Sequence, residues 1–279
     1  MPSLLRNLKT FKCAFWLGFK IESNWTDPFL FAIYSLIRPL SSLLIIIFVY
    51  IVGALSGYSD PNYATYMVLG NAFFIFAAQA IYGSIWMIHD DREHYQIIKY
   101  VYVSPSNFYI YYVGRGSFAF LLSSAISSLI TIFVGIAFLG VRIDFLKIDY
   151  LFFILNFLIS LIGLVSLSMI LASIGFFTTR TMWSLSEGLA GLFFLFCGIL
   201  FKPEQFPYPL QMFSYMLPLT YWVSLFRNSL LGLRMESLMN EFIISLGYTI
   251  FLLLFSIIFF KYSLNIAKKK GIIDVILTF

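Results

Sequence analysis

Six long apolar runs, separated by short polar segments, dominate the pattern of hydrophobic and polar positions in this chain. A helix needs about 20 residues to cross the hydrocarbon of a bilayer, and each run is long enough. The pattern therefore predicts six transmembrane helices, over Phe29–Leu55, Tyr63–Ile88, Phe108–Leu139, Tyr150–Phe177, Met182–Phe201 and Phe242–Phe260.

The segment before these runs, residues 4–25, has a different pattern. Its leucines and phenylalanines recur at steps of three and four residues, and lysines and arginines occupy much of the rest. This pattern predicts an amphipathic basic helix that lies in the cytoplasmic headgroup layer. The lysines interrupt any continuous apolar core, so a cleavable signal peptide is not expected.

A further segment, Pro209–Leu233, is apolar enough to suggest a seventh span. That arrangement would bury Pro218 and Arg227 in the bilayer and would place Lys268–Lys270 outside the cell. Irregular backbone at membrane depth is tolerated only where protein or a wet cavity surrounds it. We therefore expect residues 202–233 to form a re-entrant or outer-leaflet hairpin between the fifth and sixth spans.

The distribution of lysine and arginine tests this topology. With the N-terminus inside and six spans, twelve of the 18 basic residues lie on the inner side and five on the outer side, with Arg38 inside a span. Cytoplasmic loops carry such an excess of positive charge. We expect a multi-pass protein of the plasma membrane with both termini in the cytoplasm.

Composition agrees with a membrane protein and excludes other classes. Apolar residues make up 61% of the chain and charged residues 11%, and the mean hydropathy is +0.90. A soluble domain has about a quarter of its residues charged. The net charge of +5 is modest and gathers at the ends, so nucleic-acid binding is not expected. Two cysteines and two histidines are too few for a disulfide framework or a zinc cluster, and we expect no metal.

The densest polar stretch between apolar runs is Asp90–Pro105, D-D-R-E-H-Y-Q-I-I-K-Y-V-Y-V-S-P. At helical spacing Ile97, Ile98 and Val101 form a narrow apolar stripe on a polar turn and helix, which Pro105 ends because proline has no N–H to donate. A short polar helix between spans suits contact with a soluble partner. The alternative is a loop that carries charge for topology alone.

Two segments together carry a resemblance to a known family. Asp91–Pro105, followed by Gly114-Arg115, resembles the cytoplasmic loop of type-2 ABC exporter permeases, in which an acidic-Arg-acidic opening leads through a coupling helix to Ser-Pro. Gly198–Arg227 resembles that family's outer loop, with prolines and Pro-Leu-Thr-Tyr before an arginine. The likeness covers nearly the whole chain. One departure is Tyr95-Gln96, where the family commonly has Gly-Thr.

The resemblance implies a single transmembrane domain over residues 1–279 that exports an amphipathic, lipid-linked or glycan-type substrate or a drug. Such a permease works as a homodimer or heterodimer, and each subunit rests on a nucleotide-binding ATPase subunit. The chain contains no G-x-x-x-x-G-K-[ST] phosphate loop, so we expect no catalytic residue or cofactor here, with ATP and Mg on the partner. The expected coupling residues are Asp91, Arg92, Glu93, Ile97, Ile98 and Lys99.

The transport path has two sets of candidate residues. Prolines in the outer hairpin exclude one continuous helix, and two short helices would bring aromatic rings to the outer interface as a gate or as an interfacial anchor. These are Phe206, Tyr208, Phe213, Tyr215, Tyr221 and Trp222. Within the spans, Arg38 is expected to snorkel to the inner interface. Glu187 is expected either to contact substrate or to pair with Arg180.

Two other classes remain open on sequence alone. A secondary transporter usually shows broken helices at mid-membrane in repeated halves. An intramembrane enzyme needs acids, histidines or cysteines gathered within the spans. The chain shows neither pattern, and an ATPase that co-purifies with it is the discriminating observation.

Overall fold

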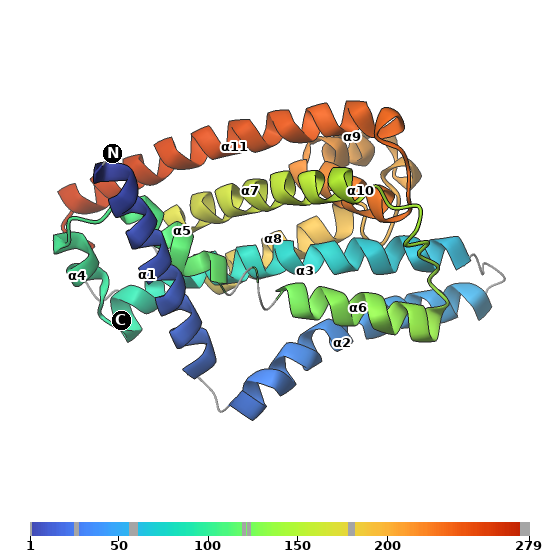
Figure 1. Cartoon of the computed structure of the whole chain (residues 1–279), viewed down its shortest axis with the longest axis horizontal. Coiled ribbons are helices and arrows are strands. Elements are labelled where there is room, and N and C mark those ends of the chain that lie inside the picture. The colour runs from blue at the N-terminus through green and yellow to red at the C-terminus, as the bar shows by residue number, and fades with distance from the viewer. Residues whose placement is uncertain are drawn as a thin grey trace.

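The computed structural model describes residues 2–24, 28–55, 61–118, 121, 124–177 and 182–273, and these residues form helices joined by short connections, with no strand among them. Figure 1 shows long helices running side by side, with shorter helices at both ends of the bundle. The α-helices are α1 (Pro2–Asn24), α2 (Pro28–Leu55), α3 (Pro61–His89), α4 (Ile98–Val103), α5 (Phe108–Phe118), α6 (Ser124–Leu139), α7 (Tyr150–Ile174), α8 (Met182–Phe196), α9 (Tyr208–Met216), α10 (Pro218–Leu230) and α11 (Met235–Lys269).

Three stretches of the described chain are long and apolar enough to cross a membrane. They correspond to α3 with its extension, α7 and α11, and they coincide with the second, fourth and sixth predicted spans. Shorter apolar helices, Ser41–Gly53, Ser124–Leu139 and Ser184–Phe196, fall within the first, third and fifth predicted spans. The all-helical membrane fold is therefore confirmed, and described helical residues lie within each of the six predicted runs.

Several helix ends differ from the sequence prediction for local reasons. The fifth run was expected to continue to Phe201, but α8 ends at Phe196 because Gly198 adopts a φ of 72°, a left-handed conformation outside the helical range. The sixth predicted span, Phe242–Phe260, lies within α11, which extends beyond it at both ends. Its last turn carries Lys268 and Lys269, and positive charges stabilise the C-terminal end of a helix. The helix can therefore continue past the apolar run into its polar flank. The third run holds two described helices, α5 and α6.

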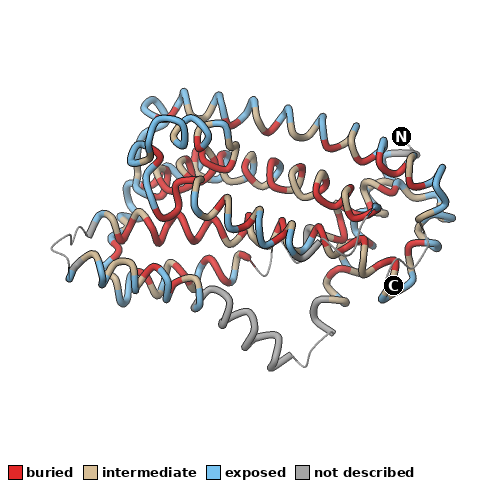
Figure 2. The backbone as a smooth tube through the Cα atoms, turned by 180° about the vertical axis from the view of Figure 1, so that it is seen from behind, coloured by how far each residue is buried: buried red, intermediate tan, exposed pale blue. Residues whose placement is uncertain are grey.

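Helix α3 forms the centre of the bundle. Leu69, Phe73, Ile81 and Ile85 on this helix are fully buried, and the buried colour covers most of its middle in Figure 2. In the most apolar window of each helix, 67% of the residues of α3 are buried against 17% for α11. The outer face of α11 is therefore free for lipid or for another subunit.

The prolines near residue 210 have the predicted effect. A single turn of 3-10 helix, η3 (Pro203–Gln205), precedes α9, and α10 starts at Pro218 directly after Leu217. Two short helices joined by a turn are thus confirmed. They lie at the end of the bundle opposite to α4 (Figure 1).

The polar stretch predicted as one turn and helix has two parts. Its acidic half extends α3 as a π-helical turn, η1 (Asp90–His94), in which the Tyr95 N–H donates to the Asp90 carbonyl at 2.8 Å. Gln96 then takes a φ of 53°, and the separate helix α4 begins. The expected polar helix is corrected in one respect: α4 carries mainly apolar and aromatic residues, Ile-Lys-Tyr-Val-Tyr-Val.

Candidate functional site

The π-turn η1 directs two neighbouring charged side chains into the protein. A π-turn holds one more residue than an α-helical turn, and Asp91 and Arg92 are both almost completely buried as a result. Buried charges are costly unless they are paired and hydrogen-bonded. The structure supplies partners for both from α5, from η1 itself and from the turn after α7.

Asp91 joins the end of α3 to α5. Its Oδ1 lies 2.9 Å from both Nε and Nη2 of Arg115, and its Oδ2 accepts a hydrogen bond from the Tyr111 hydroxyl at 3.1 Å. Tyr111 and Arg115 are four residues apart on α5, so one face of that helix supplies both donors. The sequence comparison included Gly114-Arg115 in its motif but did not identify Arg115 as the partner of Asp91.

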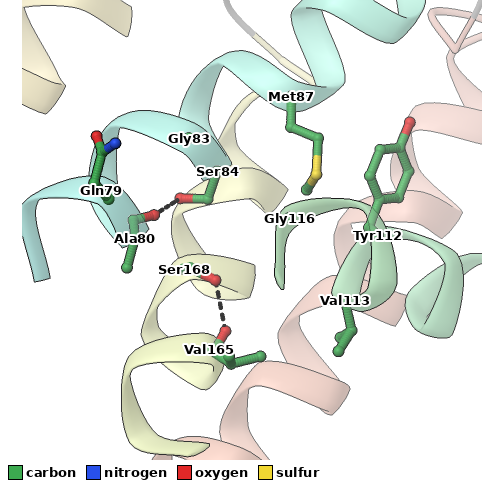
Figure 3. Close-up of a pocket in the computed structure, with 10 residues that line it drawn as sticks. All are labelled: Gln79, Ala80, Gly83, Ser84, Met87, Tyr112, Val113, Gly116, Val165 and Ser168. Carbon is green, nitrogen blue, oxygen red and sulfur yellow. Dashed lines mark hydrogen bonds between the residues drawn. The ribbon is translucent and has the colours of Figure 1, made fainter. Parts of the chain in front are cut away.

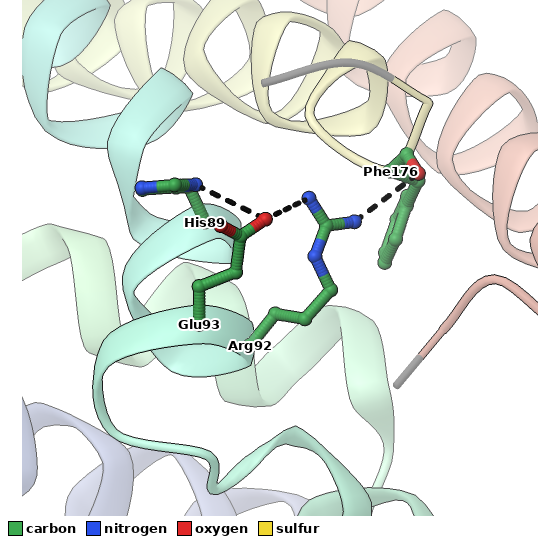
Figure 4. A network of polar contacts seen from close by, with 4 residues as sticks. All are labelled: His89, Arg92, Glu93 and Phe176. Atoms are coloured by element: carbon green, nitrogen blue, oxygen red, sulfur yellow. Dashed lines mark hydrogen bonds and ion pairs between the residues drawn. The ribbon is translucent and has the colours of Figure 1, made fainter. Parts of the chain in front are cut away.

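Arg92 joins the same turn to the end of α7. Its Nη1 donates to the Phe176 carbonyl at 3.3 Å, and its Nη2 lies 3.2 Å from Oε1 of Glu93. His89 Nδ1 lies 3.5 Å from the same Glu93 oxygen, so the four residues form one network (Figure 4). Phe176 lies in the turn two residues beyond the end of α7, and a buried backbone carbonyl needs a hydrogen-bond donor, which Arg92 supplies.

These contacts change the expected role of three predicted coupling residues. Asp91, Arg92 and Ile98 are buried and leave no surface for a partner. Their position suits holding the loop, and their part in coupling stays a prediction. Of the other three, Glu93 and Ile97 are half-buried and Lys99 is exposed.

Three of the four exposed residues of α4 were missed by sequence reasoning, and only Lys99 was predicted. Tyr100, Tyr102 and Val103 are exposed, with Val103 at 82%. Lys99 Nζ lies 5.5 Å from the Tyr100 ring centre and Lys268 Nζ lies 4.9 Å from that of Tyr102, within cation–π range. We call Lys99, Tyr100, Tyr102 and Val103 the α4 surface. The sequence could have indicated this exposure. If Ile98 faces the core in a short helix, the helical repeat turns Tyr100, Tyr102 and Val103 away from it.

A small cavity lies between α3, α5 and α7, close to this network (Figure 3). Its volume of about 20 Å³ leaves room for about one water molecule. The Ser84 hydroxyl donates to the Ala80 carbonyl at 2.6 Å and the Ser168 hydroxyl to the Val165 carbonyl at 2.7 Å, so both are satisfied by their own helices. The cavity is too small to hold a transported molecule.

Glu187 lies on an exposed face of α8, where its Oε2 accepts a hydrogen bond from the Tyr82 hydroxyl at 3.0 Å. A Cβ placed on Gly83, Gly188 or Gly191 meets no atom within 4 Å, so this face of α3 and α8 is open. The expected alternative partner, Arg180, lies outside the described residues. The side chain of Arg38 also lies outside them, although its backbone is part of α2.

The predicted gate residues do not all reach the surface. Tyr208 and Phe213 are exposed, and Phe206, Tyr215 and Tyr221 are half-buried. Trp222 contradicts the prediction: it is fully buried, and a Cβ on Gly163 of α7 would lie only 2.1 Å from its ring. The amphipathic helix α10 turns this residue toward the core because Tyr221 and Trp222 are neighbours and point in different directions.

Tyr215 fixes the start of the hairpin. Its hydroxyl donates to Oε1 of Glu204 at 3.0 Å. Burial raises the pKa of Tyr215, and the hydrogen bond to the Glu204 carboxylate raises it further. The hydroxyl therefore keeps its proton at neutral pH and links α9 to η3.

Arg227 is a further buried cation that sequence reasoning assigned only to the outer side. Its Nε donates to the Tyr66 carbonyl at 3.0 Å and its Nη2 to the Gly198 carbonyl at 2.6 Å, and the guanidinium lies 3.5 Å from the Tyr66 ring centre. A Cβ on Gly70 would lie 2.4 Å from Nη2, so a glycine is needed there. One arginine thus ties α10 to α3 and to the turn after α8.

The described residues contain no group of three histidine, cysteine, aspartate or glutamate side chains that could hold a metal ion. A search of the curated proteins found no match. A family model described as ABC-2 type transporter matches residues 11–231, which include α3 to α10 and the buried contacts of Asp91, Arg92 and Arg227. The chain therefore belongs to the ABC-2 type transporter family, a family of membrane-embedded transporter permeases.

Proposed function

We propose that this protein is the permease subunit of an ATP-driven exporter and that the α4 surface docks on a separate nucleotide-binding ATPase subunit. The family match supports a transporter, and the absence of a phosphate-loop motif from the sequence supports a separate source of ATP energy. In this proposal ATP and Mg bind to the partner, and this chain contributes no catalytic residue.

The observation that carries the proposal is an exposed apolar and basic helix held on a rigid base. Aromatic side chains are enriched at protein interfaces, and Tyr100 and Tyr102 are exposed on this helix. Beneath α4, Asp91 binds α5 and Arg92 binds the end of α7. A displacement of α4 therefore reaches three helices together, as a rigid-body shift.

The arrangement suits a cycle in which nucleotide-driven closure of the ATPase moves the bundle. Helix α4 is only six residues long and follows a left-handed residue, Gln96. A movement of α4 is therefore passed directly to η1. The ionic pairs below it are buried, and buried pairs are screened by salt much less than surface pairs. In this proposal they keep η1 and α4 connected to α5 and α7 during each cycle.

The membrane topology in this proposal has six spans, with both termini and α4 on the cytoplasmic side. The hairpin of α9 and α10 then lies on the outer side, as a re-entrant pair between the fifth and sixth spans. The exposed Lys268, Lys269 and Lys270 lie at the same end of the bundle as α4, which agrees with the positive-inside rule.

The cargo path in this proposal follows the open face of α3 and α8. Between residues 242 and 260 every exposed residue of α11 is apolar or glycine, as expected for contact with lipid. The exposed residues of α8 are instead Ser184, Glu187, Gly188, Gly191 and Leu195. A carboxylate at membrane depth is costly unless it faces water or a partner. A polar passage beside apolar spans suits an amphipathic or lipid-linked cargo.

The proposal is tested by co-purification of an ATPase with the tagged permease. Val103→Asp places a charge on the α4 surface. Leu146→Asp places the same charge on another exposed residue, in the connection between α6 and α7, which lies at the other end of the bundle. We expect the first variant to lose ATPase at least tenfold and the second to retain it, with both properly inserted. Full retention of the ATPase by Val103→Asp would overturn the proposed docking surface.

A further inference from the structure

Helix α1 exposes large apolar side chains although it is not one of the predicted spans. Leu4, Leu5, Leu8 and Trp16 are 72%, 61%, 64% and 59% exposed. Soluble surfaces rarely carry so much contiguous apolar area unless it binds something.

The same helix exposes an edge of positive charge. Arg6, Lys9, Lys12 and Lys20 are all exposed, and the sequence has no acidic residue between Leu4 and Ile21. At the angular step of an α-helix, Arg6, Lys9 and Lys20 fall within a sector of about 60°, directly beside Leu5 and Trp16. Lys20 Nζ lies 5.4 Å from the Trp16 ring centre, which ties the basic edge to the apolar one.

The third side of α1 is fixed against α5. A Cβ on Gly114 would lie 2.7 Å from the Phe11 carbonyl oxygen and 3.1 Å from the Ala14 Cβ, so the two helices touch at their backbones. Ala14 is buried and Gly18 lies one turn further on the same side. This packing prevents α1 from rolling, so its apolar and basic sides stay turned outward.

The direction of α1 matches a membrane surface. In Figure 1 it crosses the end of the bundle steeply inclined to α3, α7 and α11, which run together. A helix in that position lies near the plane of the bilayer if the long helices span it. Its apolar side then enters the acyl region and its basic edge faces the headgroups.

We propose that the outward sides of α1 bind anionic phospholipid headgroups, with Arg6, Lys9 and Lys20 as the headgroup contacts and Leu4, Leu8 and Trp16 as the apolar anchor. Charge selects the ligand: the edge is basic throughout, so a phosphate with a net negative charge binds better than a zwitterion. The surface is continuous with the spans through Gly114, so its ligand is a lipid of the adjacent leaflet. This inference goes beyond the proposed function, because it requires no ATPase.

The position of α1 gives this binding a structural consequence. Gly114, where α1 touches α5, directly precedes Arg115, the partner of Asp91. Lipids that hold α1 therefore also hold the helix that carries the buried ion pair beneath α4.

The experiment uses Cys13, which is exposed on the basic edge, whereas Cys197 is buried. The full-length protein is labelled at Cys13 with a fluorophore and placed in nanodiscs of phosphatidylcholine alone or mixed with phosphatidylglycerol. Energy transfer to headgroup-labelled tracers of each lipid gives the preference of α1 for the anionic one. We expect a clear preference for phosphatidylglycerol that falls as salt is added.

The test variant is Arg6→Gln/Lys9→Gln/Lys20→Gln, and the matched control is Lys268→Gln/Lys269→Gln/Lys270→Gln, which removes the same charge at the same end of the bundle. All six side chains are exposed, so both variants retain the fold. We expect the preference to fall about fivefold for each contacting charge removed from α1, and to persist in the control. An unchanged preference in the test variant, an equal loss in the control, or no preference in the natural protein would each overturn the proposal.

Discussion

Arg115 approaches one carboxylate oxygen of Asp91 with two nitrogens, Nε and Nη2, each at 2.9 Å. Both residues are buried, and the second carboxylate oxygen is taken by Tyr111. The pair therefore links the turn after α3 to α5, and both carboxylate oxygens of Asp91 have a partner.

Asp91→Asn is the first prediction. Removing one partner of a buried ion pair leaves an uncompensated charge and costs about 3–5 kcal/mol, so we expect a clear fall in the thermal unfolding temperature in detergent. The double variant Asp91→Asn/Arg115→Met should recover part of this loss, because no lone cation remains. A double variant as unstable as the single one would contradict the assignment.

The matched control for this prediction is the pair Asp144–Lys147, in which the carboxylate and the ammonium are also 2.9 Å apart but solvent-exposed. The hydrogen bond from Lys147 lowers the pKa of Asp144. Exposed pairs contribute little to stability. Asp144→Asn should therefore leave the unfolding temperature unchanged, and a loss equal to that of Asp91→Asn would show that burial does not decide the effect.

The second prediction concerns the contact of Gly163 with Trp222. Gly163→Ala inserts a methyl group where the indole lies, and overpacking of this kind costs about 1–3 kcal/mol. Gly247→Ala is the control, because a Cβ there meets nothing within 4 Å and alanine favours a helix over glycine by about 0.5–1 kcal/mol. The thermal unfolding temperature of Gly163→Ala should lie below that of the natural protein, and that of Gly247→Ala should lie above it. Trp222→Phe should partly rescue Gly163→Ala, and the absence of any rescue would argue against the clash.

The third prediction separates the polar passage from the lipid-facing surface. In a cysteine-free background, Glu187→Cys and Gly191→Cys on α8 should react with a small charged thiol reagent in membranes. Leu254→Cys and Ile258→Cys on α11 are equally exposed in the fold but should not react, since a charged reagent does not enter hydrocarbon. Equal reaction rates at the two sets would place the passage elsewhere.

Much of the fold was predictable because membrane spans have a strong one-dimensional signal. Runs of apolar residues fix helix positions, and prolines fix the break before α10. The pairing of Asp91 with Arg115 and the burial of Arg227 were not predictable in the same way. The first depends on the π-turn η1, and the second on Gly70, which leaves room for the guanidinium, and on the left-handed Gly198, whose carbonyl accepts from it. Both combine residues that are far apart in the sequence.

The fourth prediction is the topology. The exposed Cys13 is first replaced by serine, because it would otherwise react. A cysteine at Lys147 should then be labelled in intact cells by an impermeant thiol reagent, and one at Lys269 only after permeabilisation. Asp60, a further outer site in the six-span topology, lies outside the described residues and should behave like Lys147. Labelling at Lys269 in intact cells would favour seven spans.

The fifth prediction tests the hairpin as an outer gate. Tyr208 and Phe213 are the exposed aromatic residues of α9, and cysteines placed there should form disulfides between the hairpins of a dimer. We expect cross-linking to lower the ATP hydrolysis of the reconstituted complex and reduction to restore it. A cysteine at Leu146, on the same side of the bundle, serves as the control. Undiminished hydrolysis after complete cross-linking would make the hairpin an interfacial anchor.

The π-turn at Asp90–His94 also sets the angular phase of everything that follows it. Deleting a single residue there would convert it to an ordinary α-helical turn and would rotate the following backbone by about 100°. Asp91 and Arg92 could not then both point inward, and α4 would leave the bundle in another direction. The extra residue thus sets the direction in which α4 leaves the bundle, so a change of one residue in length is more disruptive here than most substitutions.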